Sequence, residues 1–297
     1  MANYIQQYSG TGVALVTPFD GNGEVDYPAL RKLLNHTTPH VEYLVVNGTT
    51  GESPTISVSE KAKILELIIE HAGGKPVMYG VGGNNTANVT KELKELSSTG
   101  IDSILSISPY YNKPSQEGIY QHYMAVADAS PVPVLMYNIP GRTASNMSAE
   151  TTLRLAEHPN IMGSKEAAGD ITQCFQIVKH KPEDFLLVSG DDLMALSMMA
   201  IGGAGVISVI ANAFPAEFSA IIRKALEGDF KSAHQDLLPF VENTILLFEE
   251  GNPVGVKATL ELLGLCSSQV RLPLMKGSEE LKRKISKALE QLQKPVA

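Results

Sequence analysis

Cysteine is scarce in this sequence of 297 residues, which contains only Cys174 and Cys266. The two are far apart and neither lies in a CxxC pattern, which excludes a disulfide framework and a zinc site built from thiolates. The first ten residues lack a basic segment followed by an apolar one, the mark of a secretion signal. We therefore expect a cytoplasmic protein with reduced cysteines.

Long apolar runs and an excess of positive charge are missing as well. No run approaches the roughly 20 apolar residues that span a membrane. The formal net charge is −8, which leaves no electrostatic basis for binding nucleic acid. Hydrophobic residues make up 43% of the chain and charged residues 19%, a composition typical of folded proteins. The composition thus indicates a folded protein with neither membrane nor nucleic acid as a partner.

Eight short β-rich segments alternate with segments of helical character. Most are continuous apolar runs, which is typical of strands buried on both faces. Strict alternation with helices predicts a parallel sheet with right-handed crossovers. The predicted strands are Gly12–Thr17, Tyr43–Asn47, Val77–Val81, Ser103–Ser108, Val134–Tyr137, Met162–Lys165, Leu186–Ser189 and Val206–Ile210.

Two α/β architectures fit this alternation, a closed barrel and an open doubly wound sheet. The open sheet predicts a GxGxxG motif after the first strand, and Val16–Phe19 does not offer one. Eight strands favour a (β/α)₈ TIM barrel. Beyond about Pro215 the pattern is helical only, including a helix from Leu237 to Phe248. We therefore expect a catalytic barrel over residues 1–227 and a C-terminal helical subdomain over residues 228–297.

The carboxyl ends of barrel strands are where catalytic groups are expected, and Lys165 ends the sixth strand. A lysine with an apolar stem at the barrel mouth loses hydration, which lowers its pKa and lets the neutral amine attack a ketone. The alternative is an ordinary lysine whose ammonium group reaches solvent. Tyr137, which ends the fifth strand, is either an acid or base beside that amine or an amphipathic rim residue.

Other strand ends carry groups suited to anions. Thr49 and Thr50, between two glycines, resemble a backbone nest for a carboxylate, although a plain glycine turn has the same composition. Arg142 is either a second carboxylate site or a surface arginine. Asp191 and Asp192 are explained more simply as a helix N-cap than as ligands, so we expect no metal site. The seven histidines lie mostly in or beside expected helices, so we expect no catalytic histidine.

Three motifs together resemble the dihydrodipicolinate synthase family, which belongs to the pyruvate-aldolase superfamily with N-acetylneuraminate lyase. They are Gly48–Ser53, Tyr137–Thr143 and Lys165–Ala167, and the resemblance covers essentially the whole chain. Arg142 in its Pro-Gly-Arg-Thr turn points to the synthase branch. The resemblance implies a lyase that forms a Schiff base with pyruvate and condenses it with L-aspartate 4-semialdehyde, the first committed step of diaminopimelate and lysine biosynthesis.

The resemblance also implies a role for each residue of the site. Lys165 forms the imine, and no cofactor is needed. One tyrosine of the proton relay comes from a neighbouring subunit, which implies a homotetramer built from two dimers, although a dimer alone would satisfy that requirement. The remaining roles are a relay of Tyr137, Thr49 and Tyr111 (the last from the neighbour), a pyruvate-carboxylate site at Thr50 and the Thr49 backbone, an aspartate-semialdehyde carboxylate site at Arg142, and backbone carbonyls of Gly190 and Ile207.

Two other interpretations of the sequence remain open at this point. Another pyruvate-type aldolase, such as an N-acetylneuraminate or 2-keto-3-deoxy sugar acid lyase, would share Lys165 and Tyr137. A non-catalytic barrel that senses a keto acid would share the fold, although the intact set of relay residues argues against it.

Feedback by lysine is expected to be weak or absent. Feedback-sensitive members of the family bind free lysine between subunits. In this chain the acid that would pair with the ammonium group of the bound lysine is missing, and a lysine side chain adds a charge of the same sign as that ammonium group. An inhibition assay tests this, and activity that falls by half at sub-millimolar lysine would contradict it. The chain is similar to those members at Ser53, Asn84 and Tyr110 but carries Val58, Lys61 and Asn88 where they have a ring, a histidine and a glutamate.

Overall fold

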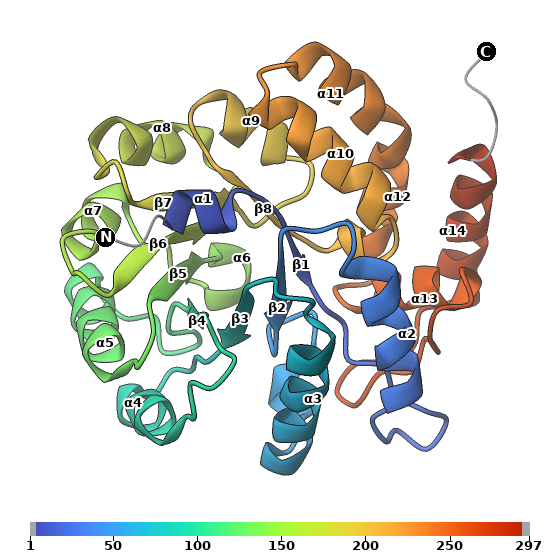
Figure 1. The fold of residues 1–297 in the computed structure, drawn as a ribbon, viewed down its shortest axis with the longest axis horizontal. Helices are drawn as coiled ribbons and strands as arrows, with labels where there is room; N and C mark the ends of the chain where they lie inside the picture. The colour runs from blue at the N-terminus through green and yellow to red at the C-terminus, as the bar shows by residue number, and fades with distance from the viewer. Residues whose placement is uncertain (1–3, 293–297) are drawn as a thin grey trace.

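Eight parallel strands pair in the order of the sequence, and the eighth pairs with the first, so the sheet closes into a barrel (Figure 1). The computed structural model describes residues 4–292 of the chain. The predicted (β/α)₈ fold is confirmed. The strands are β1 (Gly10–Ala14), β2 (Tyr43–Val46), β3 (Val77–Gly80), β4 (Ser103–Ile107), β5 (Val134–Asn138), β6 (Ile161–Glu166), β7 (Leu186–Ser189) and β8 (Gly205–Ser208).

All eight predicted strands are present, but five end earlier than predicted, and the first and the eighth do so by more than one residue. The eighth was expected to reach Ile210 and ends at Ser208. The backbone N–H groups of Val209 and Ile210 donate to the side chain of Asp192, so they are not available to a neighbouring strand. The first strand likewise ends before the predicted Thr17. The N–H of Val16, beyond the end of this strand, donates to the side chain of Asn212 (3.1 Å), so in both cases a side chain takes a backbone N–H group that a longer strand would have used.

Helices surround the barrel (Figure 1), and side chains cap the first turns of two of them, α2 and α3. The Asp26 side chain accepts from the N–H of Ala29, and Ser57 and Glu60 form a capping box. The helices of this layer, with two 3₁₀ turns, are α1 (Tyr4–Tyr8), α2 (Tyr27–Thr37), η1 (Ser53–Thr55), α3 (Val58–His71), α4 (Thr86–Glu95), α5 (Gln116–Ala129), α6 (Pro140–Thr143), α7 (Ala149–Leu155), α8 (Ile171–His180), α9 (Ala195–Ala200), η2 (Ile210–Asn212) and α10 (Pro215–Leu226).

After α10 the described chain forms helices only, as predicted. Val256 and Leu260 belong to the same buried apolar cluster as Val13 of β1, so these helices pack on the barrel. The predicted single helix from Leu237 to Phe248 is wrong. A 3₁₀ turn interrupts it at Pro239, which has no N–H group to continue an α-helix. The C-terminal elements are α11 (Phe230–Leu237), η3 (Leu238–Phe240), α12 (Val241–Phe248), α13 (Val254–Leu262) and α14 (Glu279–Leu292).

The division into residues 1–227 and 228–297 stays a prediction, and its boundary falls between α10 and α11. Residues 1–3 and 293–297, at the outer ends of the two expected parts, lie outside the described residues. Among the helices that are described, none is long and apolar enough to cross a membrane. Cys174 and Cys266 are both free thiols.

Candidate active site

A cavity of about 1070 Å³ opens at the carboxyl end of the barrel. It is lined by residues that end or follow β2, β5, β6 and β7, together with residues of α12 and of the segment before α14. This is the end of the barrel at which the sequence predicted the site. Six of the eight predicted site residues line it: Thr49, Thr50, Tyr137, Arg142, Lys165 and Gly190.

The two other predicted residues do not line this cavity. Ile207 lies in β8, is 1% exposed and packs inside the barrel with Tyr137 and Val188. Tyr111 is 86% exposed, and its backbone has a φ of +74°, in the left-handed region that non-glycine residues seldom adopt. The described chain thus holds an aromatic side chain out in solvent in an unfavourable backbone conformation.

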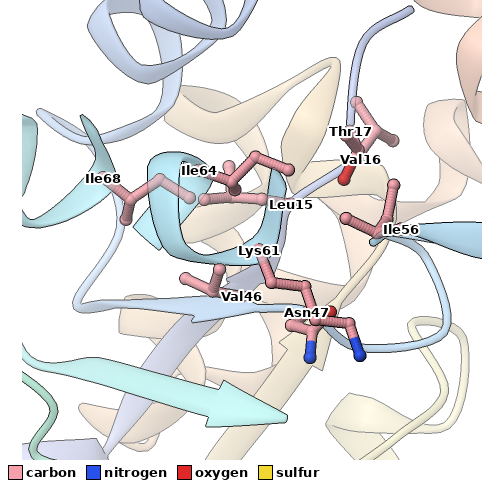
Figure 2. Close-up of a pocket in the computed structure, with 9 residues that line it drawn as sticks. All are labelled: Leu15, Val16, Thr17, Val46, Asn47, Ile56, Lys61, Ile64 and Ile68. Carbon is pink, nitrogen blue, oxygen red and sulfur yellow. The ribbon is translucent and has the colours of Figure 1, made fainter. Parts of the chain in front are cut away.

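A second cavity, between α3 and the ends of β1 and β2, is far smaller (Figure 2). Its volume is about 10 Å³, which leaves room for one water molecule at most. Of these two cavities, the larger is therefore the one that can hold a keto acid and an amino-acid aldehyde. The lining residues of the small one are Leu15, Val16, Thr17, Val46, Asn47, Ile56, Lys61, Ile64 and Ile68.

Lys165 is buried near the end of β6, with 6% of its surface exposed. Burial lowers the pKa of its ammonium group to about 7; the Asp192 carboxylate opposes this shift and the positive charge of Arg142 adds to it. At neutral pH roughly half of such amines carry no charge. The amine makes no hydrogen bond or ion pair with any residue that the structure describes, so its lone pair is available for nucleophilic attack.

The neighbours of Lys165 fix where its amine lies. Lys165 and Tyr137 are paired across β5 and β6, and the Nζ atom lies 4.1 Å from the centre of the Tyr137 ring. On the other side, a Cβ atom added at Gly190 would lie 2.9 Å from Cε of Lys165 and 2.7 Å from Cβ of Ala167. The absence of a side chain at Gly190 therefore leaves the space that the lysine stem occupies.

Asp192 is a buried acid whose charge acts on Lys165, and the sequence did not reveal it. The N-cap interpretation is wrong, because the N-cap residue of α9 is Met194; the Asp191 side chain accepts from the N–H groups of Leu193 and Met194 in the turn before that helix. Asp192 is instead 2% exposed, and burial raises its pKa to about 6. Its negative charge acts on Lys165. Two adjacent aspartates after a strand carry no signal in the sequence that would tell which of them is buried.

The loop from Gly48 to Glu52, which we call the nest loop, is tightly folded. The N–H of Gly51 donates to Gly48 O (3.2 Å) and the N–H of Glu52 donates to Thr49 O (3.0 Å). Thr50 is 3% exposed, and its hydroxyl oxygen accepts from Nδ2 of Asn252 at 3.0 Å. This contact was not predicted, because it joins residues about 200 positions apart. It leaves the Thr50 hydroxyl proton free to donate into the cavity.

Arg142 lies in α6, immediately after β5, and is exposed to the cavity. Its guanidinium group makes no hydrogen bond or ion pair with any described residue, so all of its donors are available to an anion. Among the residues that the structure describes, no group of three or more histidine, cysteine, aspartate or glutamate side chains is placed to hold a metal ion. The cavity thus contains an amine, a tyrosine and two separate groups suited to carboxylates.

The pH at which Lys165 reacts should depend on Asp192. Asp192→Asn removes the charge that raises the Lys165 pKa but keeps an oxygen to accept from Val209 and Ile210. We expect the acid limb of imine formation with a keto acid to move down by about one pH unit. Trapping rates measured against pH test this. Asp191→Asn is the matched control and should leave the limb in place, whereas an upward shift in Asp192→Asn would contradict the assignment.

Residues 7–292 match the model of the Dihydrodipicolinate synthetase family. Among curated proteins, the 4-hydroxy-tetrahydrodipicolinate synthase of Cytophaga hutchinsonii is 52% identical over 283 residues, which cover 95% of each chain. The protein of the same name from Flavobacterium psychrophilum is 48% identical over 98% of this chain and 100% of the relative. The similarity therefore includes both the barrel and the C-terminal helices.

Solved structures agree with the sequence relatives. The dihydrodipicolinate synthase from Aquifex aeolicus superposes with a TM-score of 0.92 at 40% identity and covers 96% of this chain and 98% of its own. The one from Thermotoga maritima superposes with a TM-score of 0.93 at 36% identity over the same shares. Both identities lie well above the level at which fold alone is shared. The chain belongs to the dihydrodipicolinate synthase family.

Proposed function

We propose that the chain catalyses the 4-hydroxy-tetrahydrodipicolinate synthase reaction, a lyase-type condensation of pyruvate with L-aspartate 4-semialdehyde that commits carbon to diaminopimelate and lysine. The observation that carries this proposal is the buried, unpaired amine of Lys165, with its pKa lowered to about 7, in a cavity large enough for both substrates. A neutral amine at this position is the nucleophile that such chemistry requires.

The reaction begins when the neutral Lys165 amine attacks C2 of pyruvate. Loss of water gives an imine, which withdraws electrons and lets a proton leave the pyruvate methyl group. The resulting enamine forms a carbon–carbon bond to the aldehyde carbon of the second substrate, whose oxygen takes up a proton. The amino group of that substrate then attacks the imine carbon and displaces Lys165, which closes the ring and regenerates the enzyme.

Tyr137 is the group best placed to carry these protons. Its ring adjoins the Lys165 amine, and burial raises the pKa of its hydroxyl to about 12, so it holds its proton until a partner accepts one. The Tyr137 hydroxyl makes no hydrogen bond with any described residue. In our proposal, Thr49 and Tyr111 of a neighbouring subunit complete the relay.

A second copy of the chain explains the conformation of Tyr111. Its side chain is 86% exposed, and a φ of +74° holds it away from its own barrel. Burial of this ring against another subunit would compensate for the backbone strain. We therefore propose a dimer that shares its active sites, and a homotetramer formed by two such dimers. The two free cysteines suit the cytoplasmic location that the sequence predicts.

Two anion sites hold the substrates in this proposal. The Thr50 hydroxyl and the Thr49 backbone bind the pyruvate carboxylate, and the unpaired guanidinium of Arg142 binds the carboxylate of the semialdehyde. The backbone carbonyl of Gly190, which lines the cavity, provides an acceptor near the reacting carbons. The positive charge of Arg142 also lowers the Lys165 pKa, so the same residue favours the neutral amine.

Borohydride trapping tests the proposed nucleophile directly. Incubation with pyruvate and borohydride should reduce the imine and attach the three-carbon acid to the peptide that contains Lys165, which mass mapping identifies. Lys165→Met should abolish the label, while Lys282→Met, a surface lysine on α14, should retain it. Labelling at another lysine, or at none, would overturn the proposal.

Arg142→Ala separates the synthase from other pyruvate aldolases. We expect kcat/KM for aspartate semialdehyde to fall about 100-fold, because a bidentate charge-assisted pair is lost, while pyruvate is still trapped on Lys165. Trapping should be measured at a pH where the amine is neutral in both proteins. Arg154→Ala is the control, since Arg154 pairs with Glu117 on the surface. Full turnover in Arg142→Ala would point to a different second substrate.

A further inference from the structure

Polar contacts from the C-terminal part of the chain converge on the nest loop. Nζ of Lys257, on α13, lies 2.5 Å from Oε1 of Glu52. The backbone N–H of Arg271 donates to the other oxygen of Glu52 at 3.0 Å. Nδ2 of Asn252 donates to the Thr50 hydroxyl oxygen at 3.0 Å. Three groups from beyond α12 thus hold two side chains of this loop, those of Thr50 and Glu52.

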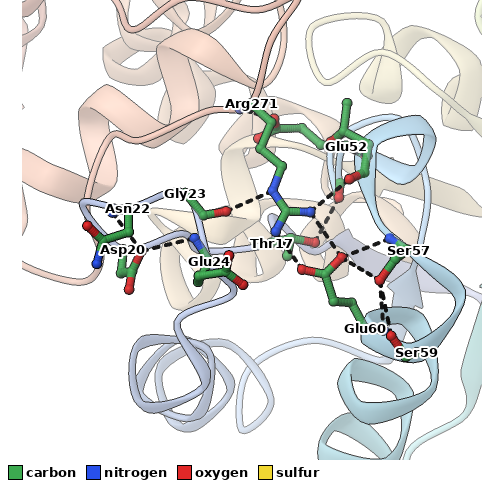
Figure 3. A network of polar contacts seen from close by, with 12 residues as sticks. Thr17, Asp20, Asn22, Gly23, Glu24, Glu52, Ser57, Ser59, Glu60 and Arg271 are labelled. Carbon is green, nitrogen blue, oxygen red and sulfur yellow. Dashed lines mark hydrogen bonds and ion pairs between the residues drawn. The ribbon is translucent and has the colours of Figure 1, made fainter.

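The Arg271 side chain extends this contact region to the first turn of α3 (Figure 3). Its guanidinium donates to the Glu60 carboxylate, to Thr55 O (2.7 Å) and to Gly23 O (2.8 Å). Its Cζ atom also lies 4.4 Å from the centre of the Phe19 ring, which Lys257 Nζ approaches to 4.1 Å. Groups from the C-terminal part of the chain therefore hold both Glu52 and the residues that follow it, Thr55 and Glu60.

The Lys257–Glu52 pair is not explained by stability alone. The two side chains are 0% and 1% exposed. Removing two charges from water costs about as much as their attraction returns, so an apolar pair of the same volume would stabilise the fold equally well or better. A buried ion pair differs from an apolar one in that it fixes the direction of each side chain. Here the fixed residue is the last one of the nest loop.

The nest loop needs such support because both of its ends are strained. Asn47, just before it, and Glu52, at its end, have φ values of +59° and +56°, in the left-handed region. On the barrel side, the Asn47 side chain donates to Gly80 O (2.8 Å) and the Thr17 hydroxyl donates to Gly51 O (2.7 Å). On the side of the loop that faces the C-terminal helices, support comes from the contacts of Lys257, Arg271 and Asn252 described above.

We propose that Lys257 and Asn252 are positioning residues for the keto-acid carboxylate. Lys257 fixes the backbone of the nest loop through Glu52, and Asn252 directs the Thr50 hydroxyl proton into the cavity. The inference rests on the proposed function, since it assigns the pyruvate carboxylate to Thr49 and Thr50. It makes the C-terminal helices a determinant of pyruvate affinity, although they contribute no reacting group.

The two-substrate kinetics distinguish positioning from a structural role. Lys257→Met or Asn252→Ala should raise KM for pyruvate about tenfold or more, and should leave KM for aspartate semialdehyde and kcat at saturating pyruvate within about twofold. A residue that only stabilised the fold would lower the active fraction, so kcat would fall and both KM values would stay. The borohydride-trapped fraction, measured against pyruvate concentration, gives the same affinity independently.

The variants are chosen so that misfolding does not obscure the result. Lys257→Met leaves the Glu52 charge buried without its partner, so the double variant Lys257→Met with Glu52→Gln removes both charges and should show the same rise in pyruvate KM. Asn252→Ala removes one neutral hydrogen bond. Lys282→Met is the matched control, because it breaks the Lys282–Glu261 pair (3.1 Å) in the same helices without touching the nest loop.

The outcomes also separate this inference from the proposed function. A wild-type protein that pyruvate and borohydride leave unlabelled would overturn both. A labelled wild type together with an unchanged pyruvate KM in Asn252→Ala and in the double variant would overturn the positioning role alone. An equal rise in both KM values would overturn it as well, because Arg142, rather than the nest loop, is assigned to the second substrate.

Discussion

Burial of the Lys165 ammonium group is the constraint on which the rest of the site depends. An ammonium that loses its hydration is destabilised relative to the neutral amine, and at Lys165 this lowers the pKa to about 7. The barrel supplies the burial, since β6 carries the lysine stem between Tyr137 and the space left by Gly190. Asp192 and Arg142 act in opposite directions on the same proton, so the amine is tuned by charge as well as by burial.

A second buried lysine shows why burial alone does not make a nucleophile. Lys257 is 0% exposed, and burial lowers its pKa too, yet its Nζ atom is held 2.5 Å from Glu52 and also donates to Gln269 O at 2.8 Å. Two of its three donors are directed at fixed acceptors. Lys165 has no such partner among the described residues. The difference between a structural and a reactive lysine in this chain is therefore the absence of a contact carboxylate, rather than the degree of burial.

The sequence predicted those features that depend on local pattern, and it did not predict those that depend on distant partners. Apolar runs located all eight strands, and strand-end positions pointed to Lys165, Tyr137 and Arg142. The end of β8 was misplaced because Asp192 takes the N–H groups that would have extended the strand. That side chain, like Lys257, lies beside residues far along the chain, and no spacing in the sequence reveals such a pair.

The same contacts bear on how the C-terminal helices relate to the barrel. Glu52 belongs to the barrel half of the chain, but both of its carboxylate oxygens are occupied by groups from residues 257 and 271. A barrel without those residues would expose or leave unpaired a charged side chain that is now 1% exposed, in a loop already strained at both ends. The apolar cluster that joins Val256 and Leu260 to β1 would be opened as well. Although the two parts differ in secondary structure, the energetics of this boundary therefore favour a single folding unit, in which the substrate site is completed only when both parts are in place.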